Sequence, residues 1–169
     1  MYGTYETIDG KPAVQFERRY PQSVEHVWRA VTEPDQLAHW FPTTVELDLR
    51  EGGAMTFTFP DGEMEPMEGS VTVLDPPRRF AFLWGEEELR LELEPDGDGC
   101  RLRFTHLISS RDAAARNAAG WHVCLDRLGD LLSGDAGDAP GSDATGEWTE
   151  LYEEYERRGV PAGAPIPGG

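Results

Sequence analysis

The sequence predicts an α+β protein in which a six- to seven-stranded antiparallel sheet packs one face against a long helix near the C-terminal end. Three observations carry this prediction. Between residues 44 and 108 apolar residues alternate with polar ones, as in strands that bury only one face. Short breaks rich in Gly and Pro separate these runs, which indicates consecutive strands joined by tight turns. An apolar stripe with helical spacing follows within residues 109–133 and supplies the cover.

A strand and two short helices precede the alternating region. The run AVQFERRY places Val14 and Phe16 on one face, which is typical of a strand, and Pro21 ends it. In SVEHVWRAVT the apolar residues recur at helical spacing, and Ser23 is the expected N-cap. A second short helix is predicted in TEPDQLAHWF, where Pro34 suits the first turn.

The strands of the alternating region are predicted in TVELDL, AMTFTF, MEGSVTVL, FAFLW, LRLELE and CRLRFTHLI. An Asp-Gly hairpin is expected within residues 60–63, in PDGE. The covered face is rich in large apolar side chains, whereas the other face carries Thr, Arg and Glu. The residues expected on the covered face include Val45, Leu47, Leu49, Met55, Phe57, Phe59, Phe80, Phe82, Trp84, Leu89, Leu91, Leu93, Cys100, Leu102, Phe104, His106 and Ile108.

The covering helix is predicted to be roughly 24 residues long. Ser109 and Asp112 form a capping pattern at its start, and Gly134 is the expected stop. Because this length spans a whole sheet, a single helix is enough to cover the apolar face.

The direction of each side chain on this helix follows from the 100° step between residues. Trp121, Cys124 and Leu125 face the sheet, whereas His122 points to the flank, with Asp126 as its neighbour one turn later. His122 and Cys124 therefore point in nearly opposite directions. This excludes a catalytic Cys–His pair within the helix, because such a pair needs hydrogen-bond reach.

The ends of the chain differ in composition from the middle. Residues 135–146 contain no aromatic and no large aliphatic side chain, whereas EWTELYEEYERR at 147–158 has an apolar stripe with helical spacing. This accessory helix is expected to dock on its own domain or on a partner, since it is too short to be stable alone. The resulting division is an N-terminal segment (1–11), a folded domain (12–134), a flexible linker (135–146), an accessory amphipathic helix (147–158) and a disordered tail (159–169).

Composition narrows the classes of partner. The chain has 15 Lys and Arg against 32 Asp and Glu, a formal charge of −17, so we expect no binding to nucleic acid or to a membrane. The two cysteines form no Cys-x-x-Cys motif, which argues against a metal site. The sequence begins without a signal-like apolar run and contains no stretch of about 18 apolar residues. We therefore expect a cytoplasmic protein without a cofactor or metal.

The chain resembles a known family in five consecutive motifs: VWRAVTEPDQLAHWF, DLREGGAMTF, EGSVTVLDPPRRFAFLW, LRFTHL and GWHVCLDRLGDLL. This family is related to the activator of the heat-shock-protein-90 ATPase and lies within the START-like (SRPBCC) superfamily; in bacteria its members are small stand-alone domains. The resemblance covers about residues 12–134. It implies a helix-grip fold, in which the sheet wraps around the long helix and leaves a largely apolar pocket. It also implies binding of lipids, polyketides or other hydrophobic molecules, with cyclisation or dehydration in a few relatives.

The candidate site combines this pocket with the aromatic residues of the covered face. A histidine on such a face needs a partner or a polar ligand, so His106 is either a core histidine bonded to backbone or water, or the polar fixture of the pocket. We assign no catalytic residue, and His106 is the candidate acid or base. The residues expected to line the pocket are Trp40, Phe57, Phe59, Phe82, Trp84, Phe104, His106, Trp121, Cys124 and Leu125.

Three functions are compatible with the sequence. The first is binding of a small hydrophobic molecule, lipid-, polyketide- or flavonoid-like, between sheet and helix. The second is a polyketide cyclase or hydrolase of the same fold with His106 as general base. The third is a protein-interaction module such as a chaperone regulator, with a protein partner or as a homodimer. Because no nucleophile–base pair is recognisable, we expect a binding protein rather than an enzyme.

Overall fold

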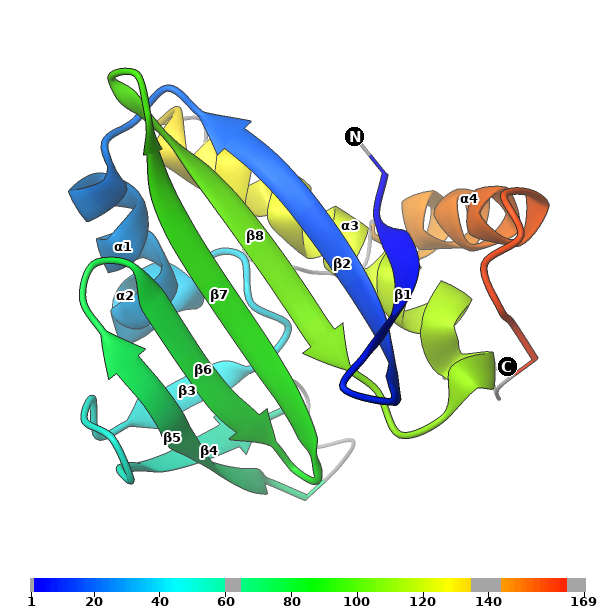
Figure 1. The fold of residues 1–169 in the computed structure, drawn as a ribbon, viewed down its shortest axis with the longest axis horizontal. Coiled ribbons are helices and arrows are strands. Elements are labelled where there is room, and N and C mark those ends of the chain that lie inside the picture. The colour runs from blue at the N-terminus through cyan, green and yellow to red at the C-terminus, as the bar shows by residue number, and fades with distance from the viewer. Residues whose placement is uncertain (1, 60–64, 135–143, 164–169) are drawn as a thin grey trace.

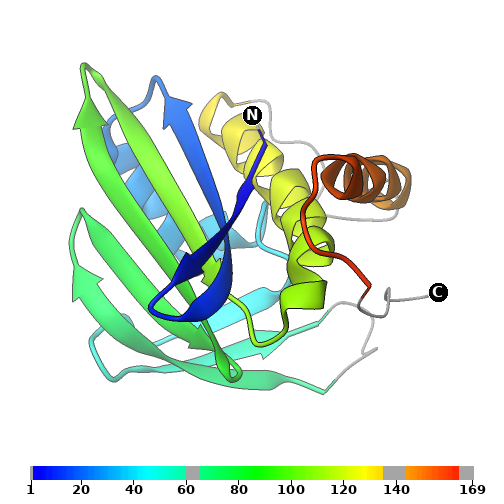
Figure 2. The same cartoon turned by 45° about the vertical axis from the view of Figure 1, so that its right-hand side comes forward.

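The computed structural model describes residues 2–59, 65–134 and 144–163. An antiparallel sheet curls around the long helix α3, and α4 lies on the far side of α3 from the sheet (Figure 1, Figure 2). This confirms the predicted fold class. The elements are β1 (Thr4–Ile8), β2 (Lys11–Tyr20), α1 (Val24–Thr32), α2 (Pro34–Leu37), β3 (Thr44–Leu47), β4 (Ala54–Thr58), β5 (Met67–Asp75), β6 (Arg79–Trp84), β7 (Glu87–Asp96), β8 (Gly99–Leu107), α3 (Ala114–Leu132) and α4 (Ala144–Arg157).

The described sheet has eight strands in the order β1-β2-β8-β7-β6-β5-β4-β3, slightly more than the six to seven predicted. The additional strand is β1, within the segment 1–11 that was placed outside the folded domain. Asp9 and Gly10 have left-handed φ values of 51° and 78°, as in the two-residue hairpins that Asp-Gly favours. Ile8 therefore pairs directly with Lys11, and the N-terminal segment becomes an edge of the sheet.

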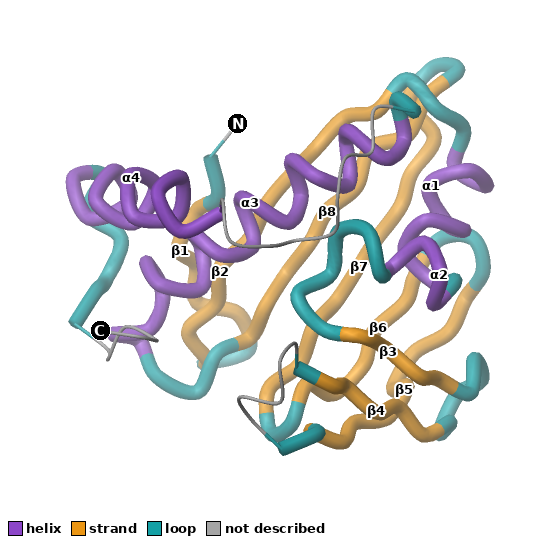
Figure 3. Tube along the Cα trace, turned by 180° about the vertical axis from the view of Figure 1, so that it is seen from behind, coloured by secondary structure: helices purple, strands orange, loops and turns teal. Residues whose placement is uncertain are grey.

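The inner face of the sheet is built from rows of apolar side chains that lie in register across neighbouring strands. Phe16 of β2 is opposite Phe104 of β8, which is opposite Leu91 of β7, which is opposite Phe80 of β6. All four side chains are at most 2% exposed. Seen from behind, α3 runs across this region between α4 at one end and α1 and α2 at the other (Figure 3). The core therefore lies between the inner face and α3.

The helix termini agree only partly with the prediction. Ser23 caps α1 as expected, because its hydroxyl accepts the backbone N–H of His26 at 3.2 Å. Gly134 follows α3 with a left-handed φ of 81°, as expected of a stop. The start of α3 differs, since the helix begins at Ala114 after a 3-10 turn and has 19 residues rather than about 24. Ser109 does not cap it, because its side chain binds a carboxylate on β7 instead.

Strand β3 is shorter than predicted. It ends at Leu47, and Leu49 is 43% exposed instead of lying on the covered face. The turn begins early because the N–H of Asp48 donates to Ala54 O and that of Arg50 donates to Asp48 O. Gly53 fits this turn only as glycine, since a Cβ there would lie 1.9 Å from Asp48 O.

Some sequence predictions lie outside the described residues. These are the hairpin within 60–63, most of the linker predicted at 135–146, and the end of the tail from residue 164. The accessory helix expected at 147–158 corresponds to α4, which docks on α3.

Replacing Leu128, which is fully buried on α3 within the core, should test the importance of the helix–sheet contact. We expect Leu128→Ala to lower the free energy of unfolding by about 2–5 kcal/mol, because it removes buried methyl groups and leaves a cavity. Urea denaturation followed by circular dichroism measures this change. The matched control, Leu49→Ala at an exposed position, should change stability by less than about 0.5 kcal/mol. Equal effects of the two substitutions would contradict the assignment.

Candidate functional site

Six aromatic side chains from the α2–β3 connection, the sheet and α3 meet inside the grip. We call them the aromatic cluster: Phe41, Phe57, Phe82, Trp84, Phe104 and Trp121. The ring centroids of Phe57 and Trp84 are 4.7 Å apart, and those of Phe104 and Trp121 are 4.8 Å apart. Trp121 of α3 also contacts Trp84 at 6.1 Å and Phe41 at 5.5 Å. These are favourable ring-pair distances, so the cluster ties α3 to the sheet.

The other predicted site residues lie around this cluster. Phe59 is half-buried at its edge, 6.2 Å from the Trp84 ring. Trp40 packs on Phe41 and is anchored elsewhere, since its indole N–H donates to Ala30 O at 2.9 Å. Leu125 is fully buried.

Cys124 is also buried and is an unfavourable nucleophile. Burial raises the pKa of its thiol to about 12, so almost none of the reactive thiolate is present at neutral pH. The side chain therefore serves as a small packing residue between α3 and the core.

Part of the interior of the grip is closely packed around a small void. A void bordered by Phe41, Phe57 and Phe82 of the cluster has a volume of only about 10 Å³, which is about the space of one water molecule. Its walls are apolar side chains from α1, α2, the α2–β3 connection and the sheet: Val31, Leu37, Trp40, Phe41, Val45, Met55, Phe57, Phe80, Phe82 and Leu91. Three of the predicted lining residues, Trp40, Phe57 and Phe82, border this void, and a ligand at this place would have to displace side chains.

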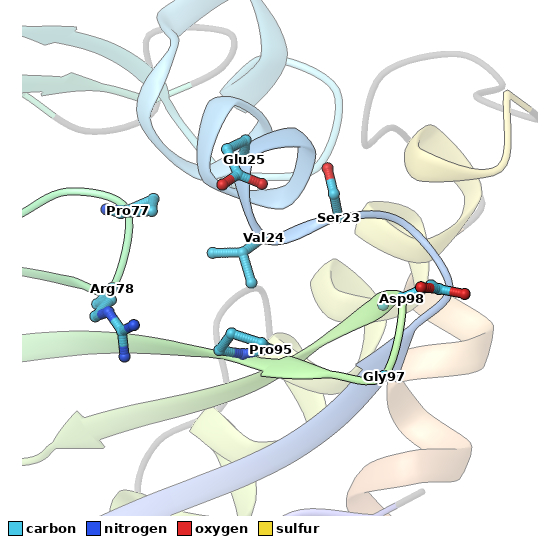
Figure 4. A pocket seen from close by; sticks show the side chains of 9 residues that line it. Ser23, Val24, Glu25, Pro77, Arg78, Pro95, Gly97 and Asp98 are labelled. Atoms are coloured by element: carbon cyan, nitrogen blue, oxygen red, sulfur yellow. The ribbon is translucent and has the colours of Figure 1, made fainter.

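Two larger depressions lie on the outside of the described molecule. One, of about 370 Å³, lies between the start of α1 and two sheet turns (Figure 4). Val24 and Pro95 lie near its centre, while the side chains of Arg78 and Asp98 lie at opposite sides of the view. The other, of about 310 Å³, lies over β5–β7. Neither depression is lined by a residue of the aromatic cluster.

A chain of hydrogen bonds leads from the aromatic cluster to the surface. The indole N–H of Trp121 donates to Nδ1 of His106 at 2.9 Å, and Nε2 of His106 lies 2.7 Å from Oε1 of Glu87. Oε2 of Glu87 accepts two further bonds from Ser109, from the backbone N–H at 2.8 Å and from the hydroxyl at 2.7 Å. His106 is 1% exposed, so this chain satisfies a histidine inside an apolar core.

The direction of these bonds fixes the proton on His106. Because an indole nitrogen only donates, Nδ1 of His106 must present its lone pair to Trp121. The ring proton of the neutral histidine is then on Nε2 and is donated to Glu87. Neither ring nitrogen has a free lone pair, so in this conformation His106 is unsuited to accept a proton from a substrate.

Glu87 supplies the charge at the end of this chain. Burial alone would raise the pKa of its carboxyl group, but the hydrogen bonds from His106 and Ser109 outweigh it and lower the pKa from 4.5 to about 2. The side chain is 22% exposed, so the charge remains partly hydrated. Glu87 is therefore an ionised partner that orients His106, and through it Trp121.

Glu87, Ser109 and Phe41 were not identified from the sequence as site residues. Glu87 was grouped with neighbouring acids as a solvated hairpin tip, although its two-residue spacing from Leu89 places it on the inner face. Phe41 was treated only as a buried helix residue, and its place in the cluster depends on the α2–β3 connection. Ser109 looked like a helix cap, because a short-range pattern does not reveal a partner 22 residues away.

The position of the ring proton is directly measurable. We expect nitrogen-15 NMR of the His106 ring at neutral pH to show a protonated Nε2 and an unprotonated Nδ1 that accepts a hydrogen bond. The exposed His39 ring is the internal control, because rapid proton exchange with water should average the tautomers that carry the ring proton on Nδ1 or on Nε2. A proton found on Nδ1 of His106 would contradict the bond from Trp121.

Glu87→Gln should destabilise the protein in a pH-dependent manner. The folded-state pKa lies below the ordinary value of 4.5, so the ionised group stabilises the fold above about pH 4.5, and this stabilisation is lost as the pH falls towards 2. We expect a loss of about 1–3 kcal/mol in unfolding free energy at pH 7. The difference from wild type should shrink between pH 5 and pH 2.5 in urea titrations. Glu86→Gln, at an exposed neighbouring position, should show neither effect.

Two further observations concern metal binding and membrane crossing. Within residues 2–59, 65–134 and 144–163, no group of three or more His, Cys, Asp or Glu side chains is arranged to hold a metal ion. In the same ranges, no helix combines the length and the apolar character needed to cross a membrane.

The chain is similar to known proteins both in family and in fold. The family model described as Activator of Hsp90 ATPase homolog 1-like protein matches residues 21–133. The crystal structure of CalU16 from Micromonospora echinospora is 27% identical, covers 92% of this chain and 94% of its own, and has a TM-score of 0.71. No curated protein sequence matches the chain.

Two more distant structures show the same fold. EF2215 from Enterococcus faecalis, a conserved protein of unknown function, is 21% identical with a TM-score of 0.72 over 92% of this chain and 89% of its own. The protein encoded by gene BPP1335 from Bordetella parapertussis is 23% identical with a TM-score of 0.68 over 99% and 95%. The family match includes α1, α3 and the strands that carry the aromatic cluster. The chain therefore belongs to the family of Activator of Hsp90 ATPase homolog 1-like proteins.

Proposed function

We propose that this protein binds a small, neutral hydrophobic molecule against the aromatic cluster, entering at its Phe59–Trp84 edge. The observation that carries the proposal is that solvent exposure differs between the inner and the outer rings of the aromatic cluster and the adjoining Phe59. Phe57 and Phe104 are fully buried, whereas Trp84 and Phe59 remain half-buried at the edge of the same set. Half-buried aromatic side chains next to a larger aromatic interior offer apolar surface that a ligand can cover.

Entry requires side chains to move, because the void bordered by the cluster is only about 10 Å³. The elements around Phe41 are suited to such movement. α2 has four residues, and β3 is a four-residue edge strand bonded on one side only. Short elements with few neighbours open at low free-energy cost, so a ligand that binds the open form better shifts the population towards it.

The polar chain behind the cluster favours binding over catalysis. Both ring nitrogens of His106 are engaged in hydrogen bonds within the protein: Nδ1 accepts from Trp121, and Nε2 donates its proton to Glu87. A general base would need the Trp121 bond to break first, which leaves the indole N–H without a partner in an apolar core. The resemblance to helix-grip proteins that hold hydrophobic molecules between sheet and helix supports the same site. The formal charge of −17 favours neutral ligands over anionic ones.

Two tryptophans provide a matched test. Trp84 and Trp148 are both half-buried, but Trp84 lies at the cluster edge and Trp148 lies on α4, stacked on Tyr152. Flavone, 2-methylnaphthalene and dodecanol are suitable neutral probes for thermal-shift measurements. We expect at least one probe to raise the melting temperature of wild type and of Trp148→Gln, each measured against its own ligand-free protein.

Trp84→Gln should lose most of that ligand-induced shift, because the substitution removes the aromatic surface at the entrance. Fluorescence titration at fixed probe concentration gives the accompanying change in dissociation constant. The proposal is wrong if none of the probes stabilises the wild-type protein. An equal shift in Trp84→Gln and Trp148→Gln would place binding away from this edge.

A further inference from the structure

Helix α4 is held on α3 by contacts that involve both ends of the chain. α4 lies alongside α3 on the side away from the sheet (Figure 2). After α4 the chain returns to α3, where the N–H of Ala115 donates to Pro161 O at 2.8 Å. Tyr155 of α4 is 0% exposed, although it belongs to a helix whose outer face is acidic. Tyr155 is therefore the most deeply buried contact that α4 makes among the described residues.

The hydroxyl of Tyr155 joins three segments of the chain. It accepts the backbone N–H of Gly3 at 2.8 Å and lies 2.8 Å from Nδ1 of His122 on α3. The Tyr2 ring packs edge-on against His122 at 5.1 Å and against Tyr155 at 5.6 Å. The Arg158 guanidinium lies 3.7 Å above the Tyr2 ring. We call Gly3, His122 and Tyr155 the latch.

His122 is thus more than the flank residue that its helical angle predicted. It lies on the flank of α3 beside Phe16 of β2, at 6.2 Å between ring centroids, and α4 and the segment before β1 cover it, so it is only 7% exposed. The predicted neighbour Asp126 is present, with Oδ2 at 3.6 Å from Nε2. Asp126 is engaged more closely by Arg18 of β2, whose Nη1 donates to Oδ1 at 2.7 Å.

The latch accommodates neutral His122 better than protonated His122. Burial raises the pKa of Tyr155 to about 12, so its hydroxyl keeps its proton at neutral pH. When the ring proton of neutral His122 is on Nε2, which faces Asp126, the Tyr155 proton is donated to Nδ1, while the hydroxyl oxygen accepts from Gly3. If Nδ1 also carried a proton, the Tyr155 proton would have to turn away. The hydrogen bonds found among the described residues offer it no other acceptor, so a buried donor would be left unpaired.

The charges around His122 come from every element packed against it. Burial lowers the pKa of His122 below 6.5, Asp126 of α3 raises it, and Arg18 of β2, the amino terminus of the chain and Arg158 after α4 lower it. The two titratable rings in contact with it are Tyr2 and Tyr155. The positive groups and the burial act in the same direction as the hydrogen-bond geometry.

We propose that His122 is the proton-sensitive element of a latch that holds α4 and the N-terminal segment on α3 when the ring is neutral and releases α4 when it is protonated. Release uncovers the face of α3 that carries His122. The latch lies on a face of α3 next to the aromatic cluster, since the His122 ring is 6.2 Å from the ring of Phe16, which packs on Phe104. It shares no residue with the cluster, so the proposal does not rest on ligand binding.

The direction of the pH effect follows from linkage. The docked state lowers the His122 pKa from 6.5, so docking is fully stabilised above about pH 6.5 and weakens as the pH falls below that value. One proton taken up on release changes the docking equilibrium by up to about tenfold per pH unit. Carboxylates are excluded as the cause in this range, because their ordinary pKa values lie near 4.

Hydrogen–deuterium exchange of the full chain at pH 7.5 and pH 5.5, corrected for intrinsic exchange rates, tests the proposal. We expect the protection of α4 amides in wild type to fall by up to about tenfold, while that of β8 stays constant. His122→Asn places a neutral acceptor near the position of Nδ1, so its α4 should show no pH dependence. Tyr155→Phe keeps the ring but removes the hydroxyl, so its α4 should be poorly protected at both pH values.

Two matched controls should behave as wild type. His39→Asn makes the same substitution at an exposed histidine, and Tyr152→Phe makes the same substitution at a half-buried tyrosine of α4. The proposal is overturned if wild-type α4 is equally protected at both pH values, or if His122→Asn responds to pH as wild type does. Should His122→Asn fail to fold by circular dichroism, an equal pH response of wild type and Tyr155→Phe overturns it.

Discussion

One face of the sheet has to be covered, and the position of every other element follows from how α3 covers it. Rows such as Phe16, Phe104 and Leu91 bury large apolar side chains. Each Å² of apolar surface removed from water stabilises the folded state by roughly 25 cal/mol. Because side chains alternate with period two, a slip of one residue in any strand would turn its row to solvent. α1 and α2 cover the end of the core away from α4, and α4 covers the back of α3 (Figure 3).

Two buried histidines use the same arrangement with different strength. Each receives a donor at Nδ1, an indole N–H for His106 and a hydroxyl for His122, and each has a carboxylate near Nε2. The Glu87 carboxylate lies 2.7 Å from Nε2 of His106, whereas the Asp126 carboxylate lies 3.6 Å from Nε2 of His122. Asp126 also forms a closer ion pair with Arg18, at 2.7 Å. His106 is therefore fixed at both ring nitrogens by close hydrogen bonds, whereas His122 is fixed closely only at Nδ1.

Periodicity accounts for most of the fold that was predictable from sequence. Alternation identified the strands from 44 onwards and placed Phe57 and Phe104 on the inner face, where they are fully buried. The edge strand β1 was missed although Asp9-Gly10 is a strong hairpin signal, because the segment beside it has little apolar patterning. Local patterns describe which face a residue lies on, and here that was enough for the architecture.

What the sequence left open depends on contacts between distant segments. Ser109 had two options, a helix cap or a bond to Glu87, and only the folded register of β7 and β8 decides between them. The helical angle gave the direction of His122 but not the helix that covers it. Whether the aromatic rings line a space or fill it depends on their joint packing, which no single motif encodes.

The bond between Gly3 and Tyr155 spans 152 residues and so closes almost the whole chain into a loop. Closure of so long a loop is entropically costly, so this contact is expected to form after the sheet and α3 have brought the two ends near each other. A change that displaces the segment before β1 would therefore remove a hydrogen bond from α4 as well, although the two segments lie far apart in the sequence.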